Sequence, residues 1–132
     1  TQAGKAEYVE ILGQRWQVRE ILGELGKKLE DLFGPHIMPF MATRNLPADG
    51  RFSFGSVRKS QGAFFKALGG VVIEVRNPIA PPSPYAFDKF DASLVDQVID
   101  NDAQARGLEL EAGLMDLRAK VIRAVGAAVE PV

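Results

Sequence analysis

The chain has 132 residues and a mass of 14.4 kDa, which fits one domain of ordinary size. Apolar residues make up 46% and charged residues 25%, close to the average of globular proteins, which excludes wholesale disorder and a collagen-like repeat. The formal net charge of −1 indicates no bulk attraction to nucleic acid or to an anionic membrane, and the lack of cysteine excludes disulfides, thiolate metal sites and a cysteine nucleophile.

The apolar runs are too short for a membrane span, which needs about 20 apolar residues. The first residues also lack the basic and then apolar pattern of a signal peptide. We therefore expect a cytoplasmic protein or a component of an assembled particle, with no membrane contact.

The first element that we expect is one long amphipathic helix within residues 1–34, over about 6–33. From Val18 the apolar residues recur at steps of 4, 3, 4 and 3, which is a heptad pattern; they are Val18, Leu22, Leu25, Leu29 and Leu32. Gly34 and Pro35 end the helix. Gly13, Gly23 and Gly26 each cost about 1 kcal/mol against alanine in a helix interior, so they weaken this prediction or mark a close approach of another backbone.

Residues 35–76 form a basic middle segment in which the helical period is lost. Phe52 and Phe54 alternate with polar residues, as in a half-buried strand, and residues 71–75 are β-branched enough for a second strand. We expect these two segments to form a small antiparallel sheet. Residues 61–68 between them fit either a short helix or a wide loop.

Residues 77–90 are predicted to be an extended arm. Four prolines fall within residues 77–84, and such a stretch spans roughly 25 Å at ~3.1 Å per residue. Tyr85, Phe87 and Phe90 follow at spacings that suit an anchor onto a core or onto a partner.

Helical periodicity returns in the acidic segment 91–132. Asp91 or Ser93 is the expected N-cap, and the first apolar stripe consists of Leu94, Val95, Val98 and Ile99. After a break at Gly107, a second stripe comprises Leu110, Leu114, Leu117, Val121, Val125 and Val129. The sequence thus predicts a single α+β domain over 1–132, with long N- and C-terminal helices flanking a small antiparallel sheet and a proline-rich arm.

Few residues support a catalytic site. His36 is the only histidine and has no partner nearby in the sequence that would fix its tautomer. Asp96 and Asp100 fall one turn apart on the expected helix, with Asp102 close behind, but no Glu-x-x-His motif accompanies them, which favours a solvated acidic face. The glycines at 50 and 55 have P-loop spacing without the following lysine. We expect no enzyme activity, no cofactor and no bound metal.

Charge is segregated along the sequence. Residues 1–34 hold 5 basic and 6 acidic groups, residues 35–87 hold 6 and 2, and residues 88–132 hold 5 and 9, which gives −1, +4 and −4. Basic and aromatic residues interleave in the middle segment at Arg51, Phe52, Phe54, Arg58, Lys59, Phe64, Phe65 and Lys66. This mixture suits phosphate contacts with base stacking, and equally a strand pair with a charged outer face and an aromatic inner face.

The leading functional hypothesis is a structural subunit that assembles with copies of itself and with other protein subunits, for example as a ring or connector in a virion. A helix of about 28 residues at ~1.5 Å per residue is roughly 42 Å long and would overhang a domain with a radius of gyration of about 14 Å. The expected partner-facing residues are the basic and aromatic set above, the acidic Asp96, Asp100 and Asp102, and Tyr85, Phe87 and Phe90. The alternatives are a nucleic-acid-binding module and a small non-catalytic subunit of a larger enzyme.

Overall fold

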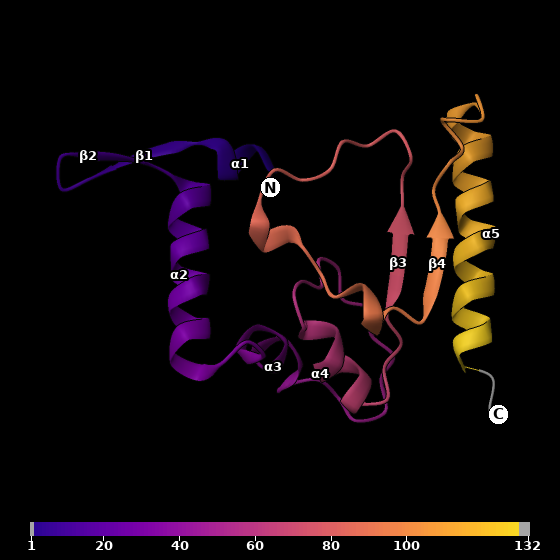
Figure 1. Ribbon diagram of the computed structural model, residues 1–132, viewed down its shortest axis with the longest axis horizontal. Helices are drawn as coiled ribbons and strands as arrows, with labels where there is room; N and C mark the ends of the chain where they lie inside the picture. The colour runs from indigo at the N-terminus through magenta and orange to yellow at the C-terminus, as the bar shows by residue number, and fades with distance from the viewer. Residues whose placement is uncertain (1, 130–132) are drawn as a thin grey trace. The chain divides into compact units, whose positions relative to one another are not determined.

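The computed structural model of the protein describes residues 2–129 (Figure 1). The chain divides into two compact units, Thr1–Gly50 and Arg51–Val132. Each unit contains helices and one small sheet of two strands, so the predicted α+β class is confirmed. The grouping of the whole chain into one domain stays a prediction.

The first unit is a hairpin followed by helices. Helix α1 (Gln2–Ala6) leads into the antiparallel strands β1 (Tyr8–Ile11) and β2 (Gln14–Gln17), and helices α2 (Val18–Phe33) and α3 (Ile37–Thr43) follow. The single long helix expected over 6–33 is therefore wrong in its first half. Helix α2 has 16 residues and spans only about 24 Å. Helix α2 is therefore too short to overhang its domain as expected from the sequence.

The hairpin replaces the helix because its residues suit a pleated strand. Val9, Ile11 and Trp16 are β-branched or aromatic and lie on one face of the pair with Gln14, while Tyr8, Glu10, Arg15 and Gln17 occupy the other face. Leu12 and Gly13 have φ angles of 52° and 76°, so both turn residues are left-handed, as a two-residue type I′ turn requires. Helix α2 then begins with the backbone N–H of Gln17 donating to Glu20 Oε2 at 3.0 Å.

The second unit contains a parallel strand pair. Helix α4 (Gln61–Ala67) precedes strand β3 (Ile73–Arg76), and the short 3₁₀ turns η1 (Ala86–Asp88) and η2 (Ala92–Leu94) precede strand β4 (Gln97–Asp100) and helix α5 (Leu110–Val129). Residues 61–68, left open by the sequence, thus form mainly a helix. Parallel strands need a long crossover, and residues 77–96, including the proline-rich arm, provide it.

In this unit, the predicted strand at 51–55 and the predicted helix that starts near residue 91 are both wrong. Residues 51–55 form no strand, and β3 pairs in parallel with β4 rather than antiparallel with that segment. The stripe expected as the start of a helix instead contributes Val98 and Ile99 to β4. Asp91 caps only η2, where its Oδ1 accepts from the Ser93 N–H at 2.9 Å. Asp96 and Asp100 therefore do not share a helical turn.

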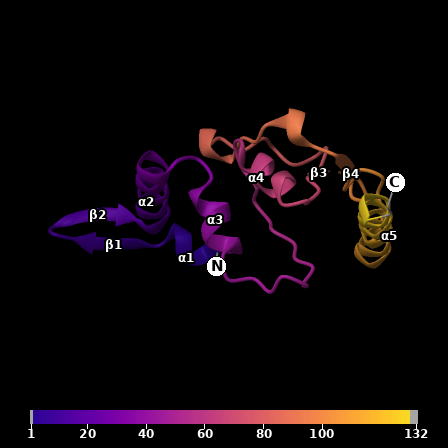
Figure 2. The same ribbon diagram turned by 90° about the horizontal axis from the view of Figure 1, so that it is seen from below.

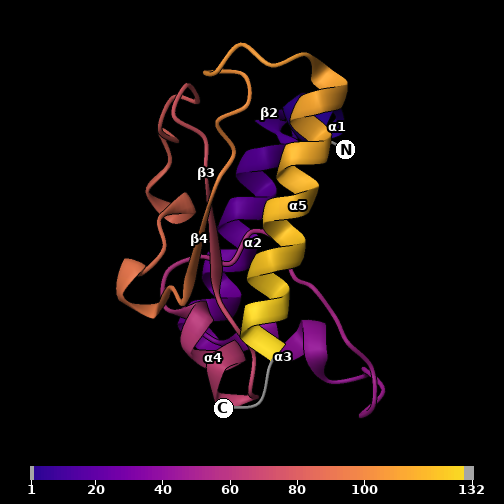
Figure 3. The same cartoon turned by 90° about the vertical axis from the view of Figure 1, so that its right-hand side faces the viewer.

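The small core lies where α5 packs against β4 (Figure 3). Its buried apolar residues are Ile99, Ala103 and Ala124. A side chain on Gly113 would begin with a Cβ only 3.0 Å from the Cβ of Ala103, so glycine allows the N-terminal part of α5 to approach the segment that follows β4. The short side chains make this contact close but also limit the apolar area that it buries.

Replacing Ile99 by alanine should lower the free energy of unfolding by about 2–4 kcal/mol, because the isoleucine is 4% exposed and its removal leaves a cavity. Urea denaturation of the full chain at fixed protein concentration measures the change. Val98→Ala is the matched control, since Val98 is the preceding residue of β4 and 44% exposed; its cost should be below about 1 kcal/mol. Equal losses for the two variants would contradict the packing of Ile99 against α5.

Candidate functional site

The main surface feature of this chain is exposed apolar area. Two separate compact domains of 50 and 82 residues would expose about 8,000 Å² together, whereas this chain exposes 10280 Å². Among the described residues no side chain is below 2% exposed. The units therefore leave apolar side chains in water that a soluble monomer of this size normally buries.

Two helices present apolar stripes to solvent. On α2 no residue is buried, and the exposed apolar residues are Leu22, Leu25, Leu32 and Phe33. On α5 the exposed apolar residues are Leu110, Leu114, Met115, Val121, Ile122 and Val125. Leu22, Leu25 and Leu32 on α2, and Leu110, Leu114, Val121 and Val125 on α5, belong to the apolar stripes expected from the sequence, so each helix leaves part of its stripe in water. Met115 and Ile122 lie off the α5 stripe.

The basic and aromatic residues of the middle segment are only partly brought together. Lys66 Nζ donates to Asp96 Oδ1 at 2.6 Å and to the Leu94 carbonyl at 3.2 Å, and Asp96 Oδ2 accepts from the Val72 N–H at 2.9 Å. The hydrogen bond from Lys66 is the main cause that lowers the pKa of Asp96. These contacts fix α4 to the start of β3 and to the segment before β4.

The aromatic rings of this segment pack on one another. Phe54 stacks on Phe65 with ring centroids 4.9 Å apart, and Phe64 meets Phe65 edge to face at 5.8 Å. Phe52 and Arg51 are exposed. The rings thus act mainly as packing groups within this unit.

The far end of the proline-rich arm is anchored on its own unit. Tyr85 stacks on Phe87 at 5.0 Å, and the guanidinium of Arg58 lies over Phe87 at 5.3 Å while pairing with Asp88 at 2.9 Å. Phe90 forms an isolated parallel bridge with Lys59, whose N–H donates to the Lys89 carbonyl at 2.6 Å. The predicted anchor therefore has at least one partner inside the chain.

The start of α5 is tied to the end of β4 by a charged network that the sequence did not reveal. Lys120 Nζ contacts Asp102 at 2.8 Å, Asp116 at 2.9 Å and the Asp100 carbonyl at 2.8 Å, and Arg106 contacts both carboxylates. Hydrogen bonds from Lys120 lower the pKa of Asp102 and of Asp116, and the bond to Asp102 is the main cause that raises the pKa of Lys120. Only the Asp116 and Lys120 spacing, one helical turn, is visible in the sequence.

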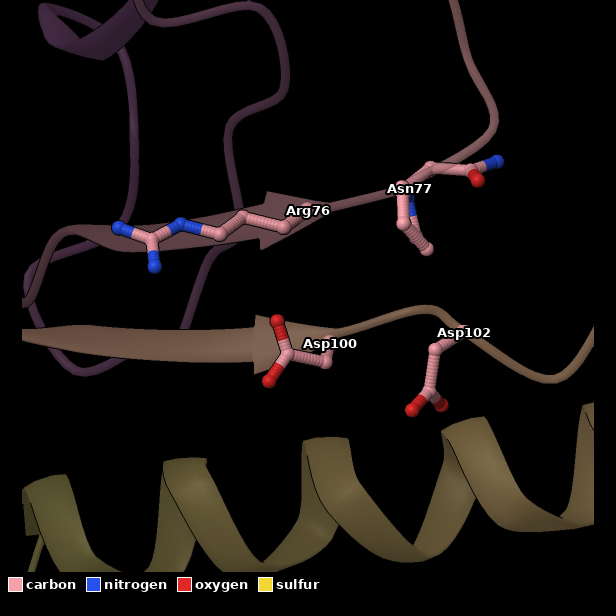
Figure 4. A pocket seen from close by; sticks show the side chains of 5 residues that line it. Arg76, Asn77, Asp100 and Asp102 are labelled. Carbon is pink, nitrogen blue, oxygen red and sulfur yellow. The ribbon is translucent and has the colours of Figure 1, made fainter. Parts of the chain in front are cut away.

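A shallow hollow of about 540 Å³ lies beside this network (Figure 4); its lining is Arg76, Asn77, Pro78, Asp100 and Asp102. Arg76 is engaged by Glu74 at 3.0 Å, and the Asp102 carboxylate points toward α5, where Lys120 holds it. The hydrogen bond that Arg76 donates to the Glu74 carboxylate is the main cause that raises the pKa of Arg76. These pairs make the hollow a structural junction, with its charges compensated locally.

The remaining features that bear on chemistry are few. His36 is half-buried at the start of α3, where its carbonyl accepts from the Phe40 N–H at 3.0 Å. Within residues 2–129 no group of three histidine, cysteine, aspartate or glutamate side chains is placed to hold a metal ion. In the same range, no helix combines the length and the apolar character needed to cross a bilayer.

Comparison with known protein families, with curated proteins and with solved structures finds no match to this chain.

Replacing Lys120 by methionine should lower stability around neutral pH, because it removes both ion pairs and the hydrogen bond to Asp100. The lowered pKa of each aspartate stabilises the fold above about pH 4 and is lost on acidification, while the raised pKa of Lys120 stabilises it below about pH 10.5 and is lost in base. Thermal melts of wild type and variant should therefore differ most between these limits and converge outside them. Lys28→Met on α2 is the control, and the same loss there would contradict this role.

Proposed function

We propose that this protein is a non-enzymatic structural subunit that assembles with copies of itself, as a ring or connector component of a larger particle. The observation that carries the proposal is the exposed apolar surface on α2 and α5, together with the very small core. An assembly buries such stripes and so supplies the apolar burial that each unit lacks by itself.

Burial of the exposed leucine side chains of α2 favours association. Full burial of a leucine side chain contributes about 1.5–3 kcal/mol, and α2 alone exposes Leu22, Leu25 and Leu32. A contact that buries this stripe therefore offers several kcal/mol toward association, before the entropy lost on association is subtracted. Obligate interfaces resemble a hydrophobic core divided between two chains, which is what these faces provide.

Charge has a smaller part in this proposal than the sequence alone indicates. The basic and acidic partner-facing residues expected from the sequence would pair between two copies. Arg51, Arg58, Lys59 or Lys66 of one copy would then contact Asp96, Asp100 or Asp102 of another. Lys66 and Asp96 already pair within one chain, as do Arg58 and Asp88, so joining copies through them would require an exchange of partners. We keep charge as a device for orientation, because exposed ion pairs contribute only about 0–1 kcal/mol each.

Nucleic-acid binding by residues 51–66 remains the second candidate. The exposed rings of Phe52 and Phe54 beside Arg51 favour it. The ring of Phe54 is stacked on Phe65, and Arg58 and Lys66 are neutralised by aspartates, which leaves fewer groups for a strand of nucleic acid. Assembly is therefore the better-supported function.

Light scattering and sedimentation velocity of the wild-type chain test the proposal, and we expect a defined multimer without nucleic acid. Leu25→Gln and Leu114→Gln should each weaken association by about tenfold or more, because each removes an apolar side chain from a contact while glutamine keeps good helix propensity. Glu24→Gln and Glu111→Gln, on the same two helices, are the matched controls and should change little.

A wild-type chain that stays monomeric at high protein concentration and low salt would contradict assembly. Salt-sensitive binding of a single-stranded oligonucleotide by such a monomer would favour the second candidate. If the chain assembles and the leucine variants behave like the glutamate controls, the helical stripes are not the contact.

A further inference from the structure

The hairpin of β1 and β2 is mostly exposed, although β2 contacts α2, the helix that follows it. All four residues of β1 are exposed, and in β2 only Gln17 is half-buried. Figures 1 and 2 show the hairpin extending away from the N-terminal end of α2. An isolated two-stranded hairpin is marginally stable in water, so this one requires a further contact to remain ordered.

The tip of the hairpin carries a second sign of a contact. Leu12 is 99% exposed and has a φ of 52°, a left-handed conformation in which leucine is strained and asparagine or glycine is preferred. A leucine in a strained backbone conformation and fully exposed to water does not stabilise the isolated chain. It does offer an apolar group at the leading end of an arm that reaches another molecule.

Strand β3 has an edge that lacks a neighbour. Its sheet consists of β3 and β4 alone, and α5 packs on β4, so in the part of the chain that the structure describes no strand pairs with the opposite edge of β3. Parallel strands are normally found in larger sheets covered on both faces. An open edge presents a row of backbone donors and acceptors that a further strand can pair with.

The faces of the two elements match. In the register of β3 with β4, Ile73 and Val75 lie on the same side as the buried Ile99, and Glu74 and Arg76 lie on the other side. In the hairpin, Val9, Ile11 and Trp16 lie on one face together with Gln14, and the other face carries Glu10, Gln17 and Arg15, which lies over the ring of Tyr8 at 4.3 Å. Strand β1 next to β3 would continue both faces across one sheet.

Within one chain these elements stay in separate sheets. We therefore propose that β1 of one copy adds to the free edge of β3 in a second copy, which joins the hairpin and the parallel pair into one four-stranded sheet. This inference rests on the proposed function, because it names the contact by which copies assemble. The two surfaces differ, so the contact is head to tail, and it gives a ring if the rotation between copies closes.

Disulfide trapping tests the contact, since the chain contains no cysteine of its own. Val9→Cys and Ile11→Cys chains are each mixed with Val75→Cys chains under mild oxidation. When Val9 and Ile11 both face Ile73 and Val75, one of the two lies opposite Val75 in either strand direction. Opposite residues on neighbouring strands have Cβ atoms about 4.5–5.5 Å apart, so a small adjustment allows a disulfide. We expect a reducible dimer containing one chain of each kind.

Glu10→Cys mixed with Val75→Cys is the matched control, because Glu10 lies on the opposite face of β1. Circular dichroism of each variant checks that it keeps the fold of the wild type. A mixed multimer that gives no reducible dimer from either apolar-face pair, or as much from the Glu10 control, would overturn strand addition and leave the proposed function standing. A Val9→Cys, Val75→Cys double variant that links only within its own chain would also overturn it. A monomeric wild type would overturn both.

Discussion

The structure of the second unit depends on one close contact, the packing of α5 on β4. Ala103, Gly113 and Ala124 allow the helix to approach the strand and the segment that follows it, and Ile99 fills the space between them. The same short side chains bury little apolar area. A contact made by small residues positions the helix closely but leaves most of the large apolar side chains outside it. The contact therefore contributes little free energy of folding from apolar burial.

Ion pairs add further links between the elements of this unit. Lys120 links the end of β4 to α5 through Asp102 and Asp116, and Lys66 links α4 to the segment before β4 through Asp96. Since these side chains remain partly solvated, they define geometry more than they add stability. Three of the nine acidic residues of segment 88–132, Asp96, Asp102 and Asp116, form these internal links, so charge segregation along the sequence does not by itself identify an intermolecular surface.

Some of the apolar groups left outside the core lie in rows. They form stripes on α2 and α5, one face of the hairpin, and the side of β3 that continues toward Ile99. Helical stripes favour packing against helices, and an exposed hairpin and an open strand edge favour strand addition, so the chain has two physically different kinds of surface. Such a division suits an assembly in which backbone pairing sets the register and apolar burial supplies the affinity.

The sequence alone determined the helical register of 18–33 and 110–129, a strand within 71–75 that the structure has at 73–76, and the α+β class, because hydrophobic period, glycine and proline positions and β-branching are local properties. It failed at 8–17, where Tyr8 and Ile11 suit a helical spacing as well as a strand, and at 94–100, where only β3 alongside decides for β4. It also could not join Lys120 to Asp102 or Lys66 to Asp96. Strand partners and ion pairs between distant residues depend on which segments meet in space, and only the tertiary structure decided that.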